Sequence, residues 1–498
     1  MRAGARLDPL LSYLTIVVVA AVVGHMLTGL ERSLWIDELI TYWVSADSFS
    51  ATLDRVAEYQ AQGPLYFLLI WGMRHCFGES EIVQRIPSLF AGIGIFVVAY
   101  RLARLFVDRS GAEICVLLLA GASSITGVFT SSRPYALAIL ASLLATYSLV
   151  RWIRCGKIQY QIIYFLSLVS MLALHFLFAA LIPAHALYVL GIKGRQASLV
   201  NIFGTMGASL LVLTVQMSQL LTTYSRQGAY SFVEAPNLAM VVGVALPLQL
   251  LVPLLGAAVV GLIWTALYYR QVSRPWTFSS DGIRLTLVLG YGPMLAILAV
   301  SLCGKTSIFW DRYLLMSLIY PVFLAGFCMR ALCPAPAAWC IAAFGAVTAL
   351  QIPVGNRLEY WREANTYANE IIARDKPLTI VWMGLVEQED LTWFRNPKHE
   401  AYFLSLLAKY PLAGEVQSWP QQFDAVDFDG QYIGRLELLK TEKRPVLLVI
   451  RNIFDPYLYM PPALERFKDR FARHGFEERL RRCFVGICVA EFKVGETH

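Results

Sequence analysis

Residues 31–66 read ERSLWIDELITYWVSADSFSATLDRVAEYQAQGPLY and follow a first apolar segment at residues 10–30. Within this stretch Asp37 and Glu38 are adjacent carboxylates a few residues beyond the apolar segment, at the depth of a lipid head group. A carboxylate at that depth is costly unless it is paired, hydrated or used for chemistry. The stretch is therefore either an ordinary hydrated loop beside a membrane helix or part of a functional site, and the remaining sequence decides between these interpretations.

The composition is that of a membrane protein with many spans. Of its 498 residues, 57% are hydrophobic and only 15% are charged, whereas a soluble protein carries roughly a quarter charged residues. The formal net charge of +7 requires no nucleic-acid partner, because basic loops on the cytoplasmic side of a membrane protein account for much of it. We expect the first apolar segment to stay in the membrane, since it is longer than the apolar part of a signal peptide.

The nine cysteines are scattered, and no Cys/His spacing is typical of a zinc site. Cys483 and Cys488 lie close together in RRCFVGICVAEF, which we interpret as one strand. An odd separation along one strand puts two side chains on opposite faces. No disulfide is therefore expected between these cysteines.

Positive charges set the predicted topology. Arg2 and Arg6 precede the first span, so the N-terminus is predicted to be cytoplasmic and residues 31–84 to form an outer loop. The apolar run at residues 64–77 is too short to cross about 30 Å of hydrocarbon as a helix, and we expect a juxtamembrane or re-entrant helix there. This choice keeps the following basic cluster inside, namely Arg101, Arg104 and Arg109.

The later apolar runs alternate between the two sides and give about eleven spans in all. Basic segments at residues 151–157 and 193–195 then fall on the cytoplasmic side. The run at residues 160–190 is too long for one span, and we divide it at His175, which places that side chain at the outer surface. The fold class predicted for residues 1–355 is thus a polytopic α-helical membrane domain.

Residues 356–498 differ in composition, with frequent charges and interspersed proline and tryptophan. An amphipathic helix followed by a strand is predicted for residues 356–383. Further strands are predicted for residues 444–452 and 483–494, with a helix at residues 463–480 between them. These patterns indicate a small C-terminal α/β domain, which the parity of the spans places outside the cytoplasm.

The polar residues predicted at the outer ends of different spans combine carboxylates with cations. A carboxylate can act as a general base toward a hydroxyl or an amine, and Arg or Lys can hold a phosphate group. This combination at the membrane edge favours a substrate whose phosphate is attached to a lipid and whose sugar or other group is transferred outside. The residues are Asp37, Glu38, Gln62, Arg133, His175, Arg226, Lys305, Asp311, Arg312 and Tyr313.

Four motifs in a fixed order carry a family resemblance. They are WIDELITYW at residues 35–43, QGPLYF and the segment after it at residues 62–106, SSRPYALAIL at residues 131–140 and WDRYLLMSLIYP at residues 310–321. Together they resemble the polytopic GT-C glycosyltransferases, above all the protein O-mannosyltransferases and the lipid A aminoarabinose and galacturonic acid transferases. The resemblance implies the GT-C fold, a donor of the polyprenyl-phosphate sugar type and transfer on the non-cytoplasmic face.

The resemblance also implies roles for particular residues. Asp37 matches the catalytic acidic position of the family, and Glu38 matches its acidic neighbour. Arg312 and Tyr313 match the Arg-Tyr pair that opens a late span, and Arg133 matches the start of an early one. We therefore predict Asp37 as the general base. The predicted donor-binding residues are Arg312, Tyr313, Arg133, Lys305, His175 and Gln62.

The chain departs from the family pattern in two places. Gln62-Gly63-Pro64 stands where the family usually has His-Pro-Pro or Lys-Pro-Pro, so a cation expected beside the donor phosphate is missing. Ser131 and Ser132 stand where many relatives carry a Glu just before the Arg. Both departures leave the identity of the sugar open.

Some of these residues could also have a purely structural role. Glu38 would alternatively cap a helix or orient its neighbours, and Arg312 would extend its charge from the membrane edge into water. His175 would be an interfacial histidine with ordinary partners. Arg226 and Tyr230, in an outer loop, carry only a weak functional prediction.

A glycosyltransferase that uses a lipid-linked sugar is the function we favour, with lipid A, a cell-envelope glycan or a protein as acceptor. It would act in a bacterial inner membrane, with the site on the extracytoplasmic face. A transporter or flippase of lipid-linked sugars is the alternative, but that class puts polar residues at mid-bilayer and often shows repeated halves. A phosphatase or ligase of polyprenyl lipids would require clustered His and Arg or metal ligands. A requirement for a divalent cation is left open, because no ligand set stands out.

Overall fold

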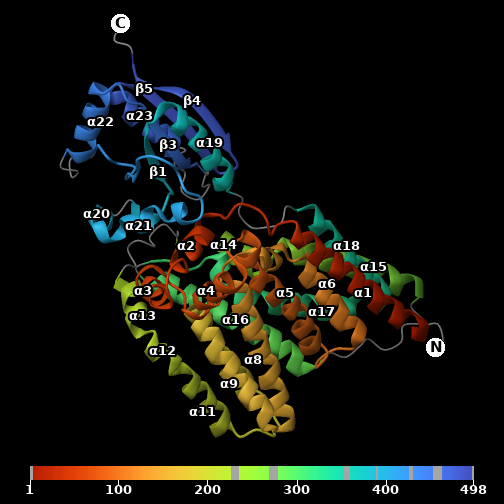
Figure 1. Cartoon of the computed structure of the whole chain (residues 1–498). Helices are drawn as coiled ribbons and strands as arrows, with labels where there is room; N and C mark the ends of the chain where they lie inside the picture. Colours follow the sequence, from red (N-terminus) through yellow and green to blue (C-terminus); the bar gives the residue numbers. More distant parts are fainter. Residues whose placement is uncertain are drawn as a thin grey trace. The chain divides into compact units, whose positions relative to one another are not determined.

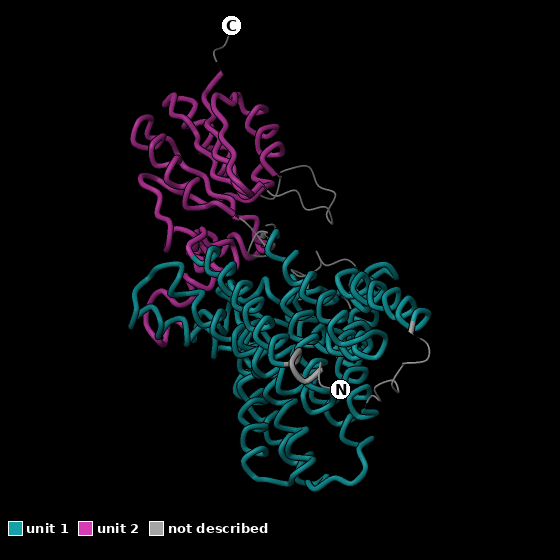
Figure 2. Tube along the Cα trace, turned by 90° about the vertical axis from the view of Figure 1, so that its right-hand side faces the viewer, with its two compact units in different colours: residues 1–30, 53–225, 235–356 teal, residues 31–52, 226–234, 357–498 magenta. Residues whose placement is uncertain are grey.

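The computed structural model describes residues 4–225, 235–268, 279–304, 306–352, 359–388, 391–424, 430–452 and 463–495 (Figure 1). Its chain divides into two compact units (Figure 2). Unit 1 comprises residues 1–30, 53–225 and 235–356, and unit 2 comprises residues 31–52, 226–234 and 357–498. The stretch that carries Asp37 thus belongs to the same compact unit as the C-terminal part of the chain.

Unit 1 is an all-helical bundle of apolar helices. Six helices in the described residues contain a stretch long and apolar enough to cross a membrane. They are α1 (Gly4–Leu27), α5 (Glu81–Ala103), α8 (Tyr135–Cys155), α15 (Leu248–Tyr268), α16 (Ser280–Cys303) and α17 (Leu315–Leu332). The count becomes eight when two bent pairs are each taken as one span. The predicted count of about eleven is reached only when three shorter apolar segments are added as well.

The bent and short segments complete the bundle. One bent pair joins α6 (Arg109–Gly121) to α7 (Ser123–Thr126) and η1 (Gly127–Thr130) at 67°, and the other joins the α11–α12 segment to α13 at 66°. The remaining helices of unit 1 are α9 (Ile158–Leu174), η2 (Phe176–Ala180), α10 (Leu181–Leu190), α11 (Leu199–Leu210), α12 (Val212–Val215), α13 (Met217–Ser225), α14 (Leu238–Ala245), η4 (Asp311–Tyr313), α18 (Ala335–Thr348) and η5 (Ala349–Gln351).

Helix α6 forms the centre of this bundle, because its residues are buried from Ser110 to Ala120 and it packs against α1, α5, α17 and α18. Asp108 caps it by accepting a hydrogen bond from the Gly111 N–H at 2.9 Å. Small residues allow the close approach of α17, since a β-carbon at Gly326 would lie 2.5 Å from Sγ of Cys115. Small residues at contacts are how helices pack closely in a membrane.

The helix break predicted at His175 is present in the structure. Helix α9 ends at Leu174, and His175 is extended, with φ −156° and ψ 107°, before η2 begins. The break at Pro247 separates α14 from α15. The segment at residues 64–77 forms α4 (Leu65–Phe77), whose 13 residues are not among the candidate spans in the described part of the chain.

Unit 2 contains a five-stranded mixed sheet in the order β2-β1-β3-β5-β4. Strands β1 (Leu378–Trp382), β2 (Val416–Ser418) and β3 (Val446–Arg451) are parallel, and β5 (Ile487–Val494) runs antiparallel to β3 and to β4 (Phe476–Phe484). The register pairs Ile380 with Leu448 and Leu448 with Ala490. The predicted C-terminal α/β domain is confirmed.

Helices cover both faces of the sheet (Figure 1). Alternate strand residues such as Ile380 and Leu448 pack with Phe467 of α23 (Ala463–Arg473) and Leu436 of α22 (Gln431–Thr441). The other face packs against α19 (Trp361–Asp375). Unit 2 also contains α2 (Ile36–Val44), η6 (Val386–Gln388), α20 (Leu391–Phe394), η7 (Pro397–His399), α21 (Glu400–Phe403) and η8 (Ser405–Ala408). Helix α3 (Phe49–Tyr59) carries the chain from unit 2 into unit 1.

Two predictions for the end of the chain were wrong. The helix predicted for residues 463–480 ends at Arg473, because Gly475 adopts φ +82° and the chain continues as β4. Cys483 and Cys488 lie on two different strands joined by a turn at Gly486, where φ is +74°. They face each other across this hairpin, with their Cα atoms 4.1 Å apart, and form a disulfide.

Candidate functional site

Helix α2 carries the two predicted carboxylates in its first turn. Oε2 of Glu38 accepts a hydrogen bond from the Trp35 N–H at 3.3 Å, and the Glu38 side chain is buried. Glu38 therefore caps the helix, which is the structural alternative that the sequence left open. Asp37 is half-buried.

The chain just before α2 is fixed by the C-terminal part of unit 2. Oε2 of Glu359 accepts a hydrogen bond from the Ile36 N–H at 3.0 Å. The Tyr410 hydroxyl accepts one from the Leu34 N–H at 2.9 Å, and the Ser33 hydroxyl accepts one from the Arg362 N–H at 3.2 Å. We call these three contacts the backbone clamp, because each involves a main-chain N–H.

Glu359 is the centre of the backbone clamp. Its carboxylate is buried and also accepts hydrogen bonds from Nε of Arg451 at 2.9 Å and Nε1 of Trp361 at 2.8 Å. A buried charge that is paired and hydrogen-bonded in this way holds a fixed position. The residue directly before Asp37 is therefore fixed through an acceptor that lies far along the chain.

Unit 1 gathers a second set of predicted site residues around His175. The ring centroid of His175 lies 5.5 Å from that of Tyr135 and 6.1 Å from that of Tyr313. His175 falls between two apolar helices and in neither of them. Burial, together with the positive charges of Arg133 and Arg312, lowers the pKa of its imidazole to about 3. His175 is thus neutral, and both guanidinium groups lie near it.

The two arginines are held in different ways. Arg312 lies in η4, with its guanidinium carbon 4.4 Å from the centroid of the Trp310 ring, which is cation–π geometry. Arg133 is buried just before α8, and its carbonyl accepts a hydrogen bond from the Ser88 hydroxyl at 3.4 Å. An arginine guanidinium commonly stacks on an aromatic ring in this way.

Gln62 joins this set through Tyr135. Its Nε2 donates a hydrogen bond to the Tyr135 hydroxyl at 3.2 Å, and its carbonyl accepts one from Nε2 of Gln219. Gly63 follows, and its N–H donates to the Leu174 carbonyl at 3.2 Å. A β-carbon at Gly63 would lie 2.0 Å from the Ala173 carbonyl oxygen. A residue with a side chain would therefore clash with this carbonyl.

The structure therefore divides the predicted site residues between the two units. Unit 1 brings together Gln62, Arg133, His175, Arg312 and Tyr313, which we call the unit 1 cluster. Unit 2 contains Asp37 and Glu38. Lys305, Arg226 and Tyr230 lie outside the described residues.

Sequence reasoning missed Glu359, Tyr410 and Gln216. Gln216 had a signal, because it is a polar residue inside the apolar run LLVLTVQMSQLL at residues 210–221. No sequence pattern indicated Glu359 or Tyr410, since their hydrogen bonds reach residues more than 300 positions away along the chain.

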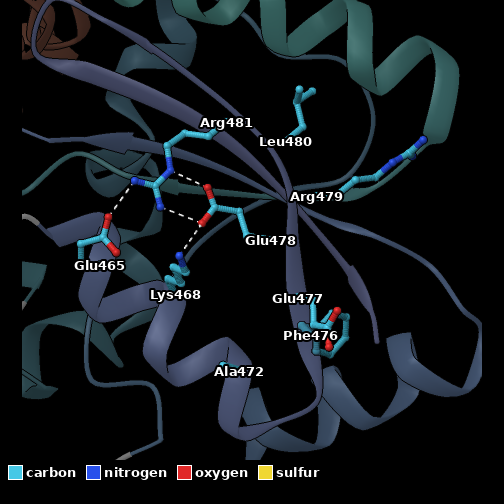
Figure 3. Close-up of a pocket in the computed structure, with 9 residues that line it drawn as sticks. All are labelled: Glu465, Lys468, Ala472, Phe476, Glu477, Glu478, Arg479, Leu480 and Arg481. Atoms are coloured by element: carbon cyan, nitrogen blue, oxygen red, sulfur yellow. Dashed lines mark hydrogen bonds and ion pairs between the residues drawn. The ribbon is translucent and has the colours of Figure 1, made fainter. Parts of the chain in front are cut away.

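A concavity beside β4 does not offer an unoccupied charged site (Figure 3). Four of its charged groups pair with one another: NH1 of Arg481 lies 2.7 Å from Oε1 of Glu465, and Nζ of Lys468 lies 3.2 Å from Oε2 of Glu478. Because β4 is an edge strand, these charges protect the sheet edge from pairing with another chain. In the described residues no group of three His, Cys, Asp or Glu side chains is arranged to hold a metal ion.

Comparison with known proteins found one family model and several solved structures that are similar to this chain. Residues 61–222 match the family model described as dolichyl-phosphate-mannose-protein mannosyltransferase. The structure is similar to the crystal structure of ArnT from Cupriavidus metallidurans in the apo state, with TM-score 0.57 and 13% identity over 96% of this chain and 98% of that chain. It is also similar to ArnT from the same organism bound to undecaprenyl phosphate, with TM-score 0.56 and 12% identity over the same shares. No curated protein matches the sequence. The chain therefore has the fold of a GT-C glycosyltransferase, which confirms the fold class and the resemblance predicted from its sequence.

Proposed function

We propose that this protein transfers a sugar from a polyprenyl-phosphate donor to an acceptor outside the cytoplasm. The observation that carries the proposal is the unit 1 cluster, where the positive charges of Arg133 and Arg312 are near enough to a buried histidine to help lower the pKa of its imidazole. Two arginines near the same buried side chain of an apolar helical domain suit a phosphate on a lipid. The similarity in fold to a protein whose crystal structure holds undecaprenyl phosphate supports the same class of donor.

The proposed reaction needs a ligand for the donor phosphate and a general base for the acceptor. Arg133 and Arg312 hold the donor phosphate, with Tyr313, His175 and Gln62 around it. The Asp37 carboxylate takes the proton of the acceptor hydroxyl or amine. A bond forms from the acceptor to C1 of the sugar, and the bond from C1 to the phosphate oxygen breaks. The polyprenyl phosphate leaves with the electron pair of that bond.

The Cys483–Cys488 disulfide supports the side of the membrane that we propose for unit 2. Disulfides form and persist in oxidising compartments and are rare in the cytoplasm. A donor made inside would then be used outside, after its lipid has crossed the membrane. The acceptor would be lipid A, a cell-envelope glycan or a protein, and the membrane a bacterial inner membrane.

Cysteine labelling tests the proposed topology. In a variant that keeps only Cys483 and Cys488, Ser48→Cys and Glu442→Cys are expected to react with an impermeant thiol reagent in intact cells. Both positions are exposed and belong to unit 2. Gln196→Cys, at an exposed position in a predicted cytoplasmic loop, is expected to react only after the cells are permeabilised. Labelling of Gln196→Cys in intact cells, with protection of the other two, would invert the topology and refute extracytoplasmic transfer.

Substitution of Glu359 tests whether the backbone clamp serves the reaction. Glu359→Gln keeps the shape but removes the charge opposite Arg451 and replaces one acceptor oxygen with a donor. We expect kcat to fall by about tenfold or more, since a hydrogen bond to a charged group contributes roughly 1.5–3 kcal/mol, while the Kd for undecaprenyl phosphate stays unchanged. Glu363→Gln, an exposed glutamate on the same helix region, is the control. Equal losses of donor binding and kcat would show a general loss of folding rather than a positioning role.

A further inference from the structure

Two apolar segments of unit 1 are interrupted, and each interruption presents a buried polar side chain. The break after α9 presents His175. The break between α12 and α13, where the segment bends by 66°, presents Gln216. Irregular backbone between apolar helices is tolerated where it is buried in protein or lines a cavity. Polar residues in such positions indicate a functional site.

The side chains at these breaks have polar atoms without partners. Oε1 and Nε2 of Gln216 are buried and make no hydrogen bond within the part of the chain that the structure describes. The same holds for both ring nitrogens of His175 and for Oε1 of Gln62. A buried polar group without a hydrogen bond costs stability, so native proteins satisfy it with protein, water or ligand.

These atoms lie around one short piece of chain. Oε1 of Gln216 would be 3.0 Å from a β-carbon at Gly63, the residue after Gln62. Gln62 is hydrogen-bonded to Tyr135, whose ring lies beside that of His175. We call Gln62, His175 and Gln216 the neutral cluster, because two are amides and the third is a neutral imidazole.

We propose that the neutral cluster binds the hydroxyl groups of an uncharged sugar carried by the lipid phosphate, with Gln216 as a residue that determines specificity. This inference rests on the proposed function, since it takes the donor phosphate to lie at Arg133 and Arg312. An amide offers donors and an acceptor together, and a neutral imidazole offers one of each, which matches a sugar hydroxyl. None of the three carries the negative charge that would favour an ammonium group on the sugar.

The test compares the lipid phosphate with and without its sugar. Purified full-length protein would be titrated with undecaprenyl phosphate and with undecaprenyl phosphate that carries mannose, glucose or 4-amino-4-deoxyarabinose. In Gln216→Leu we expect the Kd for undecaprenyl phosphate to stay within about twofold of wild type. We expect the Kd for the preferred hexose lipid to rise about tenfold, as for the loss of a buried hydrogen bond. Gln161→Leu is the control, because the Gln161 amide already donates to Thr205 at 3.0 Å.

A second variant keeps the test decisive if Gln216→Leu folds poorly. Gln216→Glu preserves the length of the side chain and introduces a carboxylate. We expect it to shift the ratio of binding constants toward the amino sugar, relative to wild type.

The outcomes separate this inference from the proposed function. Failure of the wild type to bind undecaprenyl phosphate in any form would reject the proposed function. Normal binding of undecaprenyl phosphate, with equal Kd values for the hexose lipid in wild type and both Gln216 variants, would overturn the inference and assign the neutral cluster to ordered water. A wild-type preference for the amino sugar over both hexoses would overturn the assignment of an uncharged sugar.

Discussion

Asp37→Asn is expected to abolish sugar transfer while leaving donor binding intact. An amide cannot take the acceptor proton, and removal of a general base typically costs about 10²–10⁴-fold in rate. The fold should survive, because asparagine has nearly the same shape and because the Asp37 group that binds Thr41 is its main-chain carbonyl, at 2.9 Å. Single-turnover rates with a saturating polyprenyl-phosphate sugar would measure the loss.

Two controls show whether the loss is specific to the acceptor step: the donor affinity of Asp37→Asn and the activity of a variant at another aspartate. The Kd for undecaprenyl phosphate should equal that of wild type, since Asp37 is assigned to the acceptor. Asp47→Asn, at an exposed position in the same unit, should transfer sugar normally. Transfer at the wild-type rate by Asp37→Asn would exclude Asp37 as the base.

Arg312→Ala is expected to weaken donor binding by about tenfold to a hundredfold, because a hydrogen bond to a charged group contributes roughly 1.5–3 kcal/mol. Arg312→Lys should recover only part of the affinity, since an ammonium group lacks the planar fork and stacks less well on Trp310. Titration with undecaprenyl phosphate in detergent or nanodiscs gives the Kd directly. An unchanged Kd in Arg312→Ala would remove it from the phosphate site.

Arg133→Ala provides the partner experiment. The positive charges of both arginines lower the pKa of His175, which places both near the same side chain. Their effects on the Kd should therefore be coupled rather than additive. Arg330→Ala is the control, because Arg330 pairs with Asp108 at 2.8 Å and should affect stability without changing the Kd.

Local features of the sequence predicted the local features of the fold. The break at His175 follows from the length of the apolar run, and the short α4 follows from the length of its own run. The disulfide was missed because Cys483 and Cys488 face opposite sides only if they lie on one strand, and they lie on two. Gly486 lies between them and could have indicated the hairpin turn.

Site residues beside the ends of apolar helices could be predicted from the sequence. Residues that act through hydrogen bonds to positions far away along the chain could not. Arg312 and Tyr313 precede a long apolar helix, and that position is visible in the sequence. Glu359 belongs with Ile36 only because unit 2 folds both into one body. No periodicity or spacing in a single sequence reports such a pair.

The backbone clamp also sets an order of events during synthesis. The segment with Asp37 leaves the ribosome early, whereas Glu359 follows Ile36 by 323 residues and Tyr410 follows Leu34 by 376. The main-chain N–H groups of Leu34 and Ile36 therefore lack these two acceptors until most of the bundle has been inserted and the late part of unit 2 has folded. A chain terminated before residue 359 would carry every charged group of the unit 1 cluster and still lack the Glu359 and Tyr410 acceptors of the backbone clamp. If Asp37 is the base, as we propose, partly made chains in the membrane are expected not to transfer sugar.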